Sequence, residues 1–264
     1  MEFDFGLAGK NVLLYGGHSN IGRFATYGFA QCGAHVTIAA RDMKSAQEVC
    51  DEALALGAAS ARCIKCDTTS YEETAAAADF ALENTGRIDC VYHGVAWDQL
   101  DSFLDLPREY WDRLYEVNFK SVMNAWHYII PKMIEAGGGN FVNVASVMGR
   151  QHATEEPVYG ALKSAVIHLG QTIAIEHGKE HIRINFVAPG PTPPVDGRYT
   201  TGSPWAEFFK HPEAMEKFGQ YSPMGQVGNP AECGYAAVYL GSEVTGRHLT
   251  GQIIGLDGGW YMPK

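Results

Sequence analysis

The chain has 264 residues, of which 46% are hydrophobic and 19% charged, so it is long enough for one large domain with a continuous core. Its formal net charge of -10 repels phosphate backbones, which argues against nucleic acid as a partner. The first residues carry acidic groups and no apolar signal stretch, and no apolar run approaches the roughly 20 residues that span a bilayer. We therefore expect a cytoplasmic protein with no membrane partner.

Six cysteines raise the question of a metal site, because Cys63 and Cys66 have the spacing of half a zinc site. The chain has no second CxxC. The segment around Cys63 has the pattern of a strand, where positions three apart point to opposite faces, so the two thiols are not expected to converge. We expect structural thiols and no metal.

Short apolar runs alternate with longer segments of helical period along the chain. This alternation predicts a parallel sheet covered by helices on both faces, which is a doubly wound α/β domain, the Rossmann fold. The whole chain, 1–264, is expected to form this single domain, with ligands at the carboxyl ends of the strands. A Pro- and Gly-rich segment, 190–228, is expected to be a substrate loop. The predicted strands are 11–15, 35–40, 61–65, 88–92, 140–145 and 182–188, and predicted helices begin near 20 and cover 44–56 and 71–84.

The first strand is followed by GGHSNIG, residues 16–22. Glycine permits a tight turn and lets backbone N–H groups approach a pyrophosphate, which the following helix N-terminus favours electrostatically. Asn20 stands where a third glycine would complete the pattern, and asparagine is among the residues best tolerated at positive φ. A plain strand-to-helix turn is the alternative. The position after the first strand favours a dinucleotide site formed by Gly16, His18, Ser19, Asn20, Ile21 and Gly22.

The end of the second strand distinguishes the two nicotinamide cofactors. A carboxylate there binds the adenosine ribose hydroxyls of NAD, whereas an arginine can pair with the 2'-phosphate of NADP. The strand is followed by Arg41 and then Asp42. Arg41 favours NADP, and Asp42 keeps NAD as the second candidate.

A catalytic pattern lies in the second half of the chain. Ser146 ends a predicted strand, and Tyr159 follows 13 positions later with Lys163 four residues beyond it. Residues four apart share one face of a helix, so the Lys163 ammonium is expected beside the phenol of Tyr159. That charge is predicted to lower the pKa of Tyr159 and make it a general acid and base.

A second Tyr-x-x-x-Lys match occurs at Tyr128 and Lys132. Pro131 is expected to disrupt the helical geometry there, and no serine stands at the corresponding upstream distance. The pair at 159 and 163 is therefore the predicted catalytic one.

At these residues the chain resembles the short-chain dehydrogenase/reductase family. The resemblance runs from the glycine loop to LTGQIIGLDGG at 249–259, and it includes YGALK at 159–163 and NFVAPG at 185–190. It implies a nicotinamide cofactor, a proton transfer by Tyr159 to a substrate oxygen that Ser146 hydrogen-bonds, and a Lys163 that also binds the nicotinamide ribose. It further implies a relay water near Asn118.

The same resemblance implies further contacts to the cofactor. It puts Asp67 and Thr68 near the adenine and Pro189, Gly190 and Thr192 near the nicotinamide carboxamide. Turn chemistry is the alternative for Asp67, and a buried structural amide is the alternative for Asn118.

The chain departs from the family after the fourth strand, where the usual Asn-Asn-Ala-Gly is replaced by His93-Gly94-Val95-Ala96. His93 and Gly94 are still assigned to the cofactor site, since a neutral imidazole offers one donor and one acceptor. A satisfied structural histidine is the alternative. Thr192 is expected to replace the threonine that the family has where this chain has Pro194.

Aromatic residues after Gly190 and side chains after the fourth and fifth strands are candidate substrate contacts, with core or subunit packing as the alternative. The pattern predicts an alcohol dehydrogenase or ketone reductase for a compact hydrophobic or cyclic small molecule. By resemblance we expect a homotetramer or homodimer. A lyase like the halohydrin dehalogenases and a dinucleotide-sensing regulator are the alternatives. The candidate substrate residues are Trp97, Met148, His152, Tyr199 and Trp205.

Overall fold

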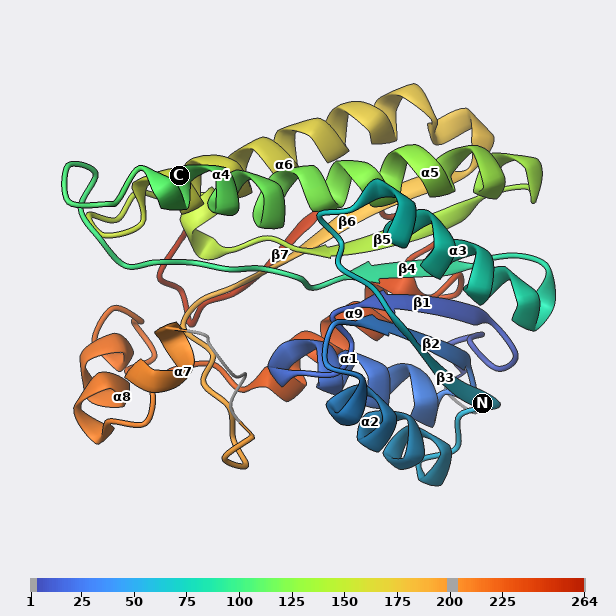
Figure 1. Cartoon of the computed structure of the whole chain (residues 1–264), viewed down its shortest axis with the longest axis horizontal. Coiled ribbons are helices and arrows are strands. Elements are labelled where there is room, and N and C mark those ends of the chain that lie inside the picture. Colours follow the sequence, from blue (N-terminus) through green and yellow to red (C-terminus); the bar gives the residue numbers. More distant parts are fainter. Residues whose placement is uncertain (1–3, 199–203, 264) are drawn as a thin grey trace.

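The computed structural model describes residues 4–198 and 204–263, and its centre is one parallel sheet (Figure 1). In the described residues this sheet has seven strands in the order β3-β2-β1-β4-β5-β6-β7, and each neighbouring pair is parallel. This order confirms the doubly wound α/β fold. The strands are β1 Asn11–Tyr15, β2 His35–Ala40, β3 Ser60–Lys65, β4 Cys90–His93, β5 Gly139–Val144, β6 Ile182–Pro189 and β7 Ile253–Leu256.

Helices cover both faces of the sheet, as Figure 1 shows. Helices α3, α5 and α6 pack on one face around the buried Trp126 and Phe186. Helices α1 and α9 pack on the other face, where Phe29 and Val238 are buried. The helices are α1 Asn20–Gln31, α2 Met43–Ala55, α3 Tyr71–Thr85, α4 Glu109–Tyr115, α5 Ser121–Glu135, α6 Pro157–Glu176, α7 Pro204–Phe208, α8 Pro212–Gly219 and α9 Pro230–Gly241.

The apolar periodicity locates the strands and helices because it reflects which face is buried. Every residue of β1 and β6 is buried, as expected for strands covered on both sides. Helix ends follow local chemistry: Asp42 caps α2, and Asn229 with Glu232 forms a capping box on α9.

Helix α5 corrects one expectation, because it continues through Pro131. Proline removes one N–H donor, but the packing of Trp126, Ile130 and neighbouring side chains on the sheet holds the helix together. The partly buried Tyr128 therefore does have Lys132 beside its ring, 4.5 Å from the centroid. The Tyr128 hydroxyl donates to Asp79 on α3, so this pair is bonded to another helix and not to the site.

The six cysteines are free thiols, and Cys63 and Cys66 pack into different hydrophobic clusters, as their positions on and after a strand predict. Within the described ranges, no group of three or more histidine, cysteine or acidic side chains is arranged to hold a metal ion. No helix in the same ranges is long and apolar enough to cross a membrane.

Candidate active site

A cavity of about 760 Å³ lies at the carboxyl ends of the strands. The glycine loop and the pair Ser146 and Tyr159 all contribute to its wall. Most of the predicted site residues are in this wall. They are Gly16, His18, Ser19, Asn20, Ile21, Gly22, Arg41, Asp67, Thr68, Gly94, Trp97, Ser146, Met148, Tyr159, Pro189, Gly190, Thr192 and Trp205.

Other predicted residues are placed elsewhere. Among the described residues, Lys163, Asn118, His93 and His152 are not part of the wall. Lys163, Asn118 and His93 are buried at 2%, 0% and 2% exposure beneath it, and His152 is exposed. Tyr199 lies outside the described residues.

The glycine loop is as tight as the sequence pattern predicts. A Cβ on Gly22 would lie 2.0 Å from the carbonyl oxygen of Gly16, so no side chain fits there. Gly16 has φ 78°, and a Cβ on it would meet Val95 at 3.1 Å. The loop thus packs closely on the segment after β4, and the N-terminus of α1 begins at the cavity with its first N–H groups available for an anion.

Asn20 adopts φ 38°, the left-handed conformation expected of the residue that replaces glycine. Its side-chain amide donates to the Thr192 carbonyl at 2.9 Å. This hydrogen bond joins the glycine loop to the segment after β6, a role that glycine cannot supply. Thr192 itself turns its hydroxyl to the Gly190 carbonyl at 2.9 Å.

The end of β2 presents Arg41 and Asp42 to the cavity. The Asp42 carboxylate accepts hydrogen bonds from the backbone N–H groups of Lys44 and Ser45, at 3.1 and 3.2 Å, and from the Ser45 hydroxyl at 2.7 Å. Its oxygens are therefore largely occupied by capping α2. The same holds for Asp67, whose carboxylate bonds the N–H and hydroxyl of Thr69, which matches the turn chemistry considered above.

Ser146, Tyr159 and Lys163 converge as their spacing predicts. Ser146 lies two residues after the end of β5, and its hydroxyl interacts with Tyr159, the third residue of α6. The Lys163 Nζ lies 5.3 Å from the Tyr159 ring centroid and donates to the Val144 carbonyl at 3.1 Å. The three side chains form one acid–base group at the end of the cavity.

The electrostatics of Tyr159 correct the sequence prediction. Burial, followed by the charges of Asp98 and Glu156, raises the pKa of Tyr159 well above its ordinary value, and Ser146 only partly opposes this. Burial also lowers the pKa of Lys163 to about 8, with Asp98 opposing it. Tyr159 is therefore a protonated phenol, because desolvation and the two nearby carboxyl groups oppose its ionisation.

Asn118 lies in a π-helical turn, Glu116–Lys120, between α4 and α5. Its amide nitrogen donates to the carbonyls of Trp97 and Leu114 at 2.6 and 3.0 Å, and its oxygen accepts from Trp97 N–H at 3.3 Å. The side chain thus fixes the segment that carries Trp97 in the cavity wall. Asn118 thus has the contacts of a buried structural amide, which was the alternative to its role near a relay water.

His93 is buried beneath the cavity wall, where its ring lies 5.5 Å from that of Tyr15. Burial first, and Lys163 second, lowers the pKa of His93 to about 3, so the ring is neutral. Its Nε2 has no hydrogen-bond partner among the described residues. The predicted cofactor contact by His93 therefore finds no support in its position, whereas Gly94 does line the cavity.

Sequence reasoning missed several charged residues of the wall, above all Asp98 and Glu156. Glu156 could have been found, because it precedes Tyr159 by three residues and so lies one helical turn away on the same side. Asp98 belongs to an irregular segment, 58 residues earlier in the chain, and no periodicity predicts its direction. The other missed charged residues of the wall are Arg23, Glu48, Arg113 and Arg198.

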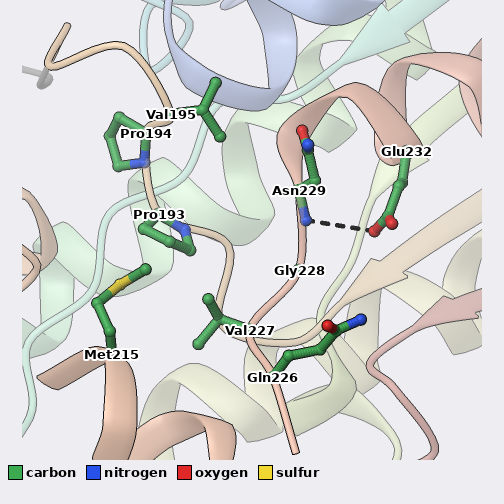
Figure 2. A pocket seen from close by; sticks show the side chains of 9 residues that line it. All are labelled: Pro193, Pro194, Val195, Met215, Gln226, Val227, Gly228, Asn229 and Glu232. Atoms are coloured by element: carbon green, nitrogen blue, oxygen red, sulfur yellow. Dashed lines mark hydrogen bonds between the residues drawn. The ribbon is translucent and has the colours of Figure 1, made fainter. Parts of the chain in front are cut away.

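Part of the aromatic wall comes from the segment 190–228. Trp205 packs on Phe209 and Phe218, with ring centroids 5.3 and 5.2 Å away, so these side chains form a small core of their own as well as part of the wall. A second hollow of about 510 Å³ lies beside the loop. Figure 2 shows it between Pro193, Met215 and Val227, with the Asn229–Glu232 hydrogen bond at its edge. It contains none of the acid–base residues.

Known proteins resemble this chain over nearly its whole length. The family model described as enoyl-(acyl carrier protein) reductase matches residues 16–261. The 7alpha-hydroxysteroid dehydrogenase of Escherichia coli K12 is 29% identical over 96% of this chain and 94% of its own. The cyclohexanol dehydrogenase of Acinetobacter sp. SE19 is 30% identical, with coverages of 95% and 94%.

Solved structures agree with these relatives. A 7alpha-hydroxysteroid dehydrogenase in complex with NADH and 7-oxo glycochenodeoxycholic acid superposes with a TM-score of 0.85 at 28% identity, over 98% of both chains. The Pseudomonas aeruginosa RhlG complex with NADP gives 0.88 at 26% identity, over 99% of this chain and 100% of that one.

The fold and the Ser146, Tyr159 and Lys163 group define an NAD(P)-dependent oxidoreductase. The chain belongs to the short-chain dehydrogenase/reductase family.

Proposed function

We propose that the protein interconverts a secondary alcohol and a ketone by hydride transfer, with NADP preferred and a compact hydrophobic or cyclic substrate. One observation carries the proposal: Ser146 and Tyr159 end a cavity that begins at the glycine loop, with Lys163 beneath. The relatives named for cyclohexanol and hydroxysteroid oxidation support it. A lyase without a nucleotide loop and a sensor without the acid–base pair fit the chain less well.

Each residue of the acid–base group has one role in the proposed reaction. A bound nicotinamide cofactor supplies the hydride. In ketone reduction Tyr159 gives its proton to the substrate oxygen, and Ser146 hydrogen-bonds the same oxygen as charge develops on it. The raised pKa of Tyr159 keeps the phenol protonated, which suits this direction. Lys163 lies with its Nζ 5.3 Å from the Tyr159 ring centroid, and we assign it the cofactor ribose by its resemblance to the family.

The cavity wall fits a dinucleotide. Only glycine fits at position 22, which leaves the backbone N–H groups of the turn open to a pyrophosphate. NADP is favoured because the oxygens of Asp42 are used to cap α2, whereas Arg41 forms no ion pair with any described residue. An exposed guanidinium at this end of the cavity can receive the 2'-phosphate.

Tyr159→Phe tests the reaction. Loss of the acid should lower ketone reduction by about 100-fold or more while NADPH still binds, as followed by fluorescence titration. Tyr128→Phe is the matched control, since Tyr128 also has a lysine four residues later but bonds Asp79 on the surface. Equal activities of wild type and the Tyr159 variant on a panel of cyclic ketones would refute the assignment.

Arg41→Ala tests the cofactor choice. A charge-assisted bond to a phosphate contributes about 1.5–3 kcal/mol, so the Kd for NADPH should rise roughly 10- to 100-fold while the Kd for NADH stays within about twofold. An equal change for both cofactors contradicts the phosphate contact.

We also propose that the protein forms a homodimer or homotetramer. Helix α4 exposes Trp111 and Tyr115, and α6 exposes 84% of Ile175, all large apolar side chains on the helices flanking the site. Light scattering of the purified chain measures the state, and a monomer at micromolar concentration refutes the proposal.

A further inference from the structure

Two carboxyl groups meet on the substrate side of the cavity. Asp98 follows β4 and Glu156 immediately precedes α6, and their side chains hydrogen-bond each other. A backbone hydrogen bond of 3.0 Å from Asp101 N–H to the Glu155 carbonyl holds the two segments together. Both carboxyl groups line the same cavity as Tyr159.

Burial makes this pair unusual. Asp98 is 5% exposed and Glu156 is half-buried, and two adjacent carboxyl groups withdrawn from water resist being ionised together. Burial, then the hydrogen bond and charge of Asp98, raises the pKa of Glu156 to about 9, and burial raises that of Asp98 as well. At neutral pH the pair therefore keeps one proton and carries one negative charge.

The charged and titratable groups around the pair are few. Glu155 further raises the pKa of Glu156, and Lys163 opposes the rise for Asp98. Tyr159 is protonated, and Arg113 lies with its guanidinium 4.0 Å from the Trp97 ring centroid. Among the described residues, neither carboxyl group forms an ion pair with a lysine or arginine.

The hydrogen bonds show which oxygens are available to a ligand. Asp98 accepts from the Gln99 N–H at 2.8 Å and from the Trp205 indole N–H at 3.1 Å, so both of its oxygens are engaged. Glu156 has no such second set of donors in the described structure and presents the open acceptor. Asp98 is therefore held in place by these donors, and Glu156 keeps free acceptor capacity in the cavity wall.

We propose that Asp98 and Glu156 bind a protonated amine of the substrate, so that the substrate class is an amino alcohol or amino ketone. The proposal rests on the proposed function and specifies its substrate. An ammonium has three N–H donors and can bridge both carboxylates by replacing their shared proton, which leaves to solvent. A hydroxyl offers one donor and no charge.

Three ring alcohols of similar size separate the possibilities: trans-2-aminocyclohexanol, trans-1,2-cyclohexanediol and trans-2-methylcyclohexanol, each oxidised with NADP. We expect the amine to have the highest kcat/KM. In Glu156→Gln the ratio of kcat/KM for the amine to that for the methyl compound should fall at least about tenfold. Glu155→Gln, a neighbouring acidic residue outside the cavity wall, should leave the ratio unchanged.

Preference for the diol or the methyl compound would overturn the proposal, as would an unchanged ratio in Glu156→Gln. Taking a ratio cancels any general effect of the substitution on Tyr159 or on folding.

Binding supplies a readout without turnover. The amino alcohol is titrated by calorimetry into the enzyme–NADPH complex, which cannot react with an alcohol, in two buffers of different ionisation enthalpy at pH 7. Wild type should release close to one proton per amine bound, and Glu156→Gln close to none. Amine binding without proton release refutes the shared-proton exchange.

The two proposals fail separately. Proton-linked amine binding without oxidation of any of the three alcohols would contradict the proposed reaction and still support the amine site. Turnover of the methyl compound with no preference for the amine would support the proposed reaction and contradict the amine site.

Discussion

The buried Lys163 gives a stability prediction opposite to the usual effect of removing an active-site residue. Its pKa falls from 10.5 to about 8 because burial disfavours the ammonium. A difference of this size corresponds to about 3 kcal/mol of folding free energy at neutral pH. Lys163→Met keeps the volume and removes the charge, but it also loses the hydrogen bond to the Val144 carbonyl, worth about 1 kcal/mol.

The variant should therefore gain about 2 kcal/mol in free energy of unfolding at pH 7, a rise in Tm of about 4–8 °C for a chain of this size, while activity is lost. The gain must depend on pH. Between pH 8 and 10.5 the folded wild type holds a neutral lysine whereas the unfolded chain holds a charged one, so wild-type stability rises with pH. At pH 9.5 the advantage of the variant should fall below about 1 kcal/mol.

Equilibrium urea unfolding followed by circular dichroism, at one fixed protein concentration, measures both differences. Lys132→Met is the matched control, because Lys132 lies on the surface beside Tyr128 and Asp79, contacts that raise its pKa. That variant should lose up to about 1 kcal/mol. The reasoning is refuted if Lys163→Met is no more stable than wild type at pH 7, or if its advantage does not change with pH.

Two further predictions concern the cofactor side of the cavity. Gly22→Ala should weaken NADPH binding by at least about tenfold, because its Cβ would meet the Gly16 oxygen at 2.0 Å, whereas Gly178→Ala, which meets nothing within 4 Å, should bind normally. Asp196→Asn should lower the Tm by about 2–4 °C. The Asp196 carboxylate lies 2.6 Å from the guanidinium of the buried Arg23, and the substitution leaves that buried charge without its partner in the segment 190–228. Normal NADPH affinity in the first variant, or an unchanged Tm in the second, would contradict the respective contact.

The sequence predicts most of the fold because buried strands appear as short apolar runs, and helices with one buried face appear as apolar residues at helical spacing. It also predicts the meeting of Tyr159 and Lys163, since four-residue spacing on a helix fixes their common face. Asn20 was correctly expected at positive φ, because few other residues tolerate that backbone conformation.

The differences between the sequence-based predictions and the structure have a common physical origin. The pKa of Tyr159 depends on burial and on Asp98, which reaches the site from a segment without periodic structure. His93 lies beneath the cavity wall instead of in it, and its neighbour across the sheet, Asn143, comes from a strand that follows much later. Pro131 was expected to break α5, but packing on the sheet outweighs the loss of one hydrogen bond. Each effect depends on contacts between distant segments.

The π-helical turn at Glu116–Lys120 limits how this chain can accept insertions and deletions. An α-helix rotates about 100° per residue, so a one-residue deletion in the turn that restored a regular helix would rotate α5 by that angle relative to α4. Trp126 and Met133 would then leave the core. The loop at 190–228 can change length without such an effect. We expect natural length variation at the loop and a fixed residue count between Asn118 and the buried face of α5.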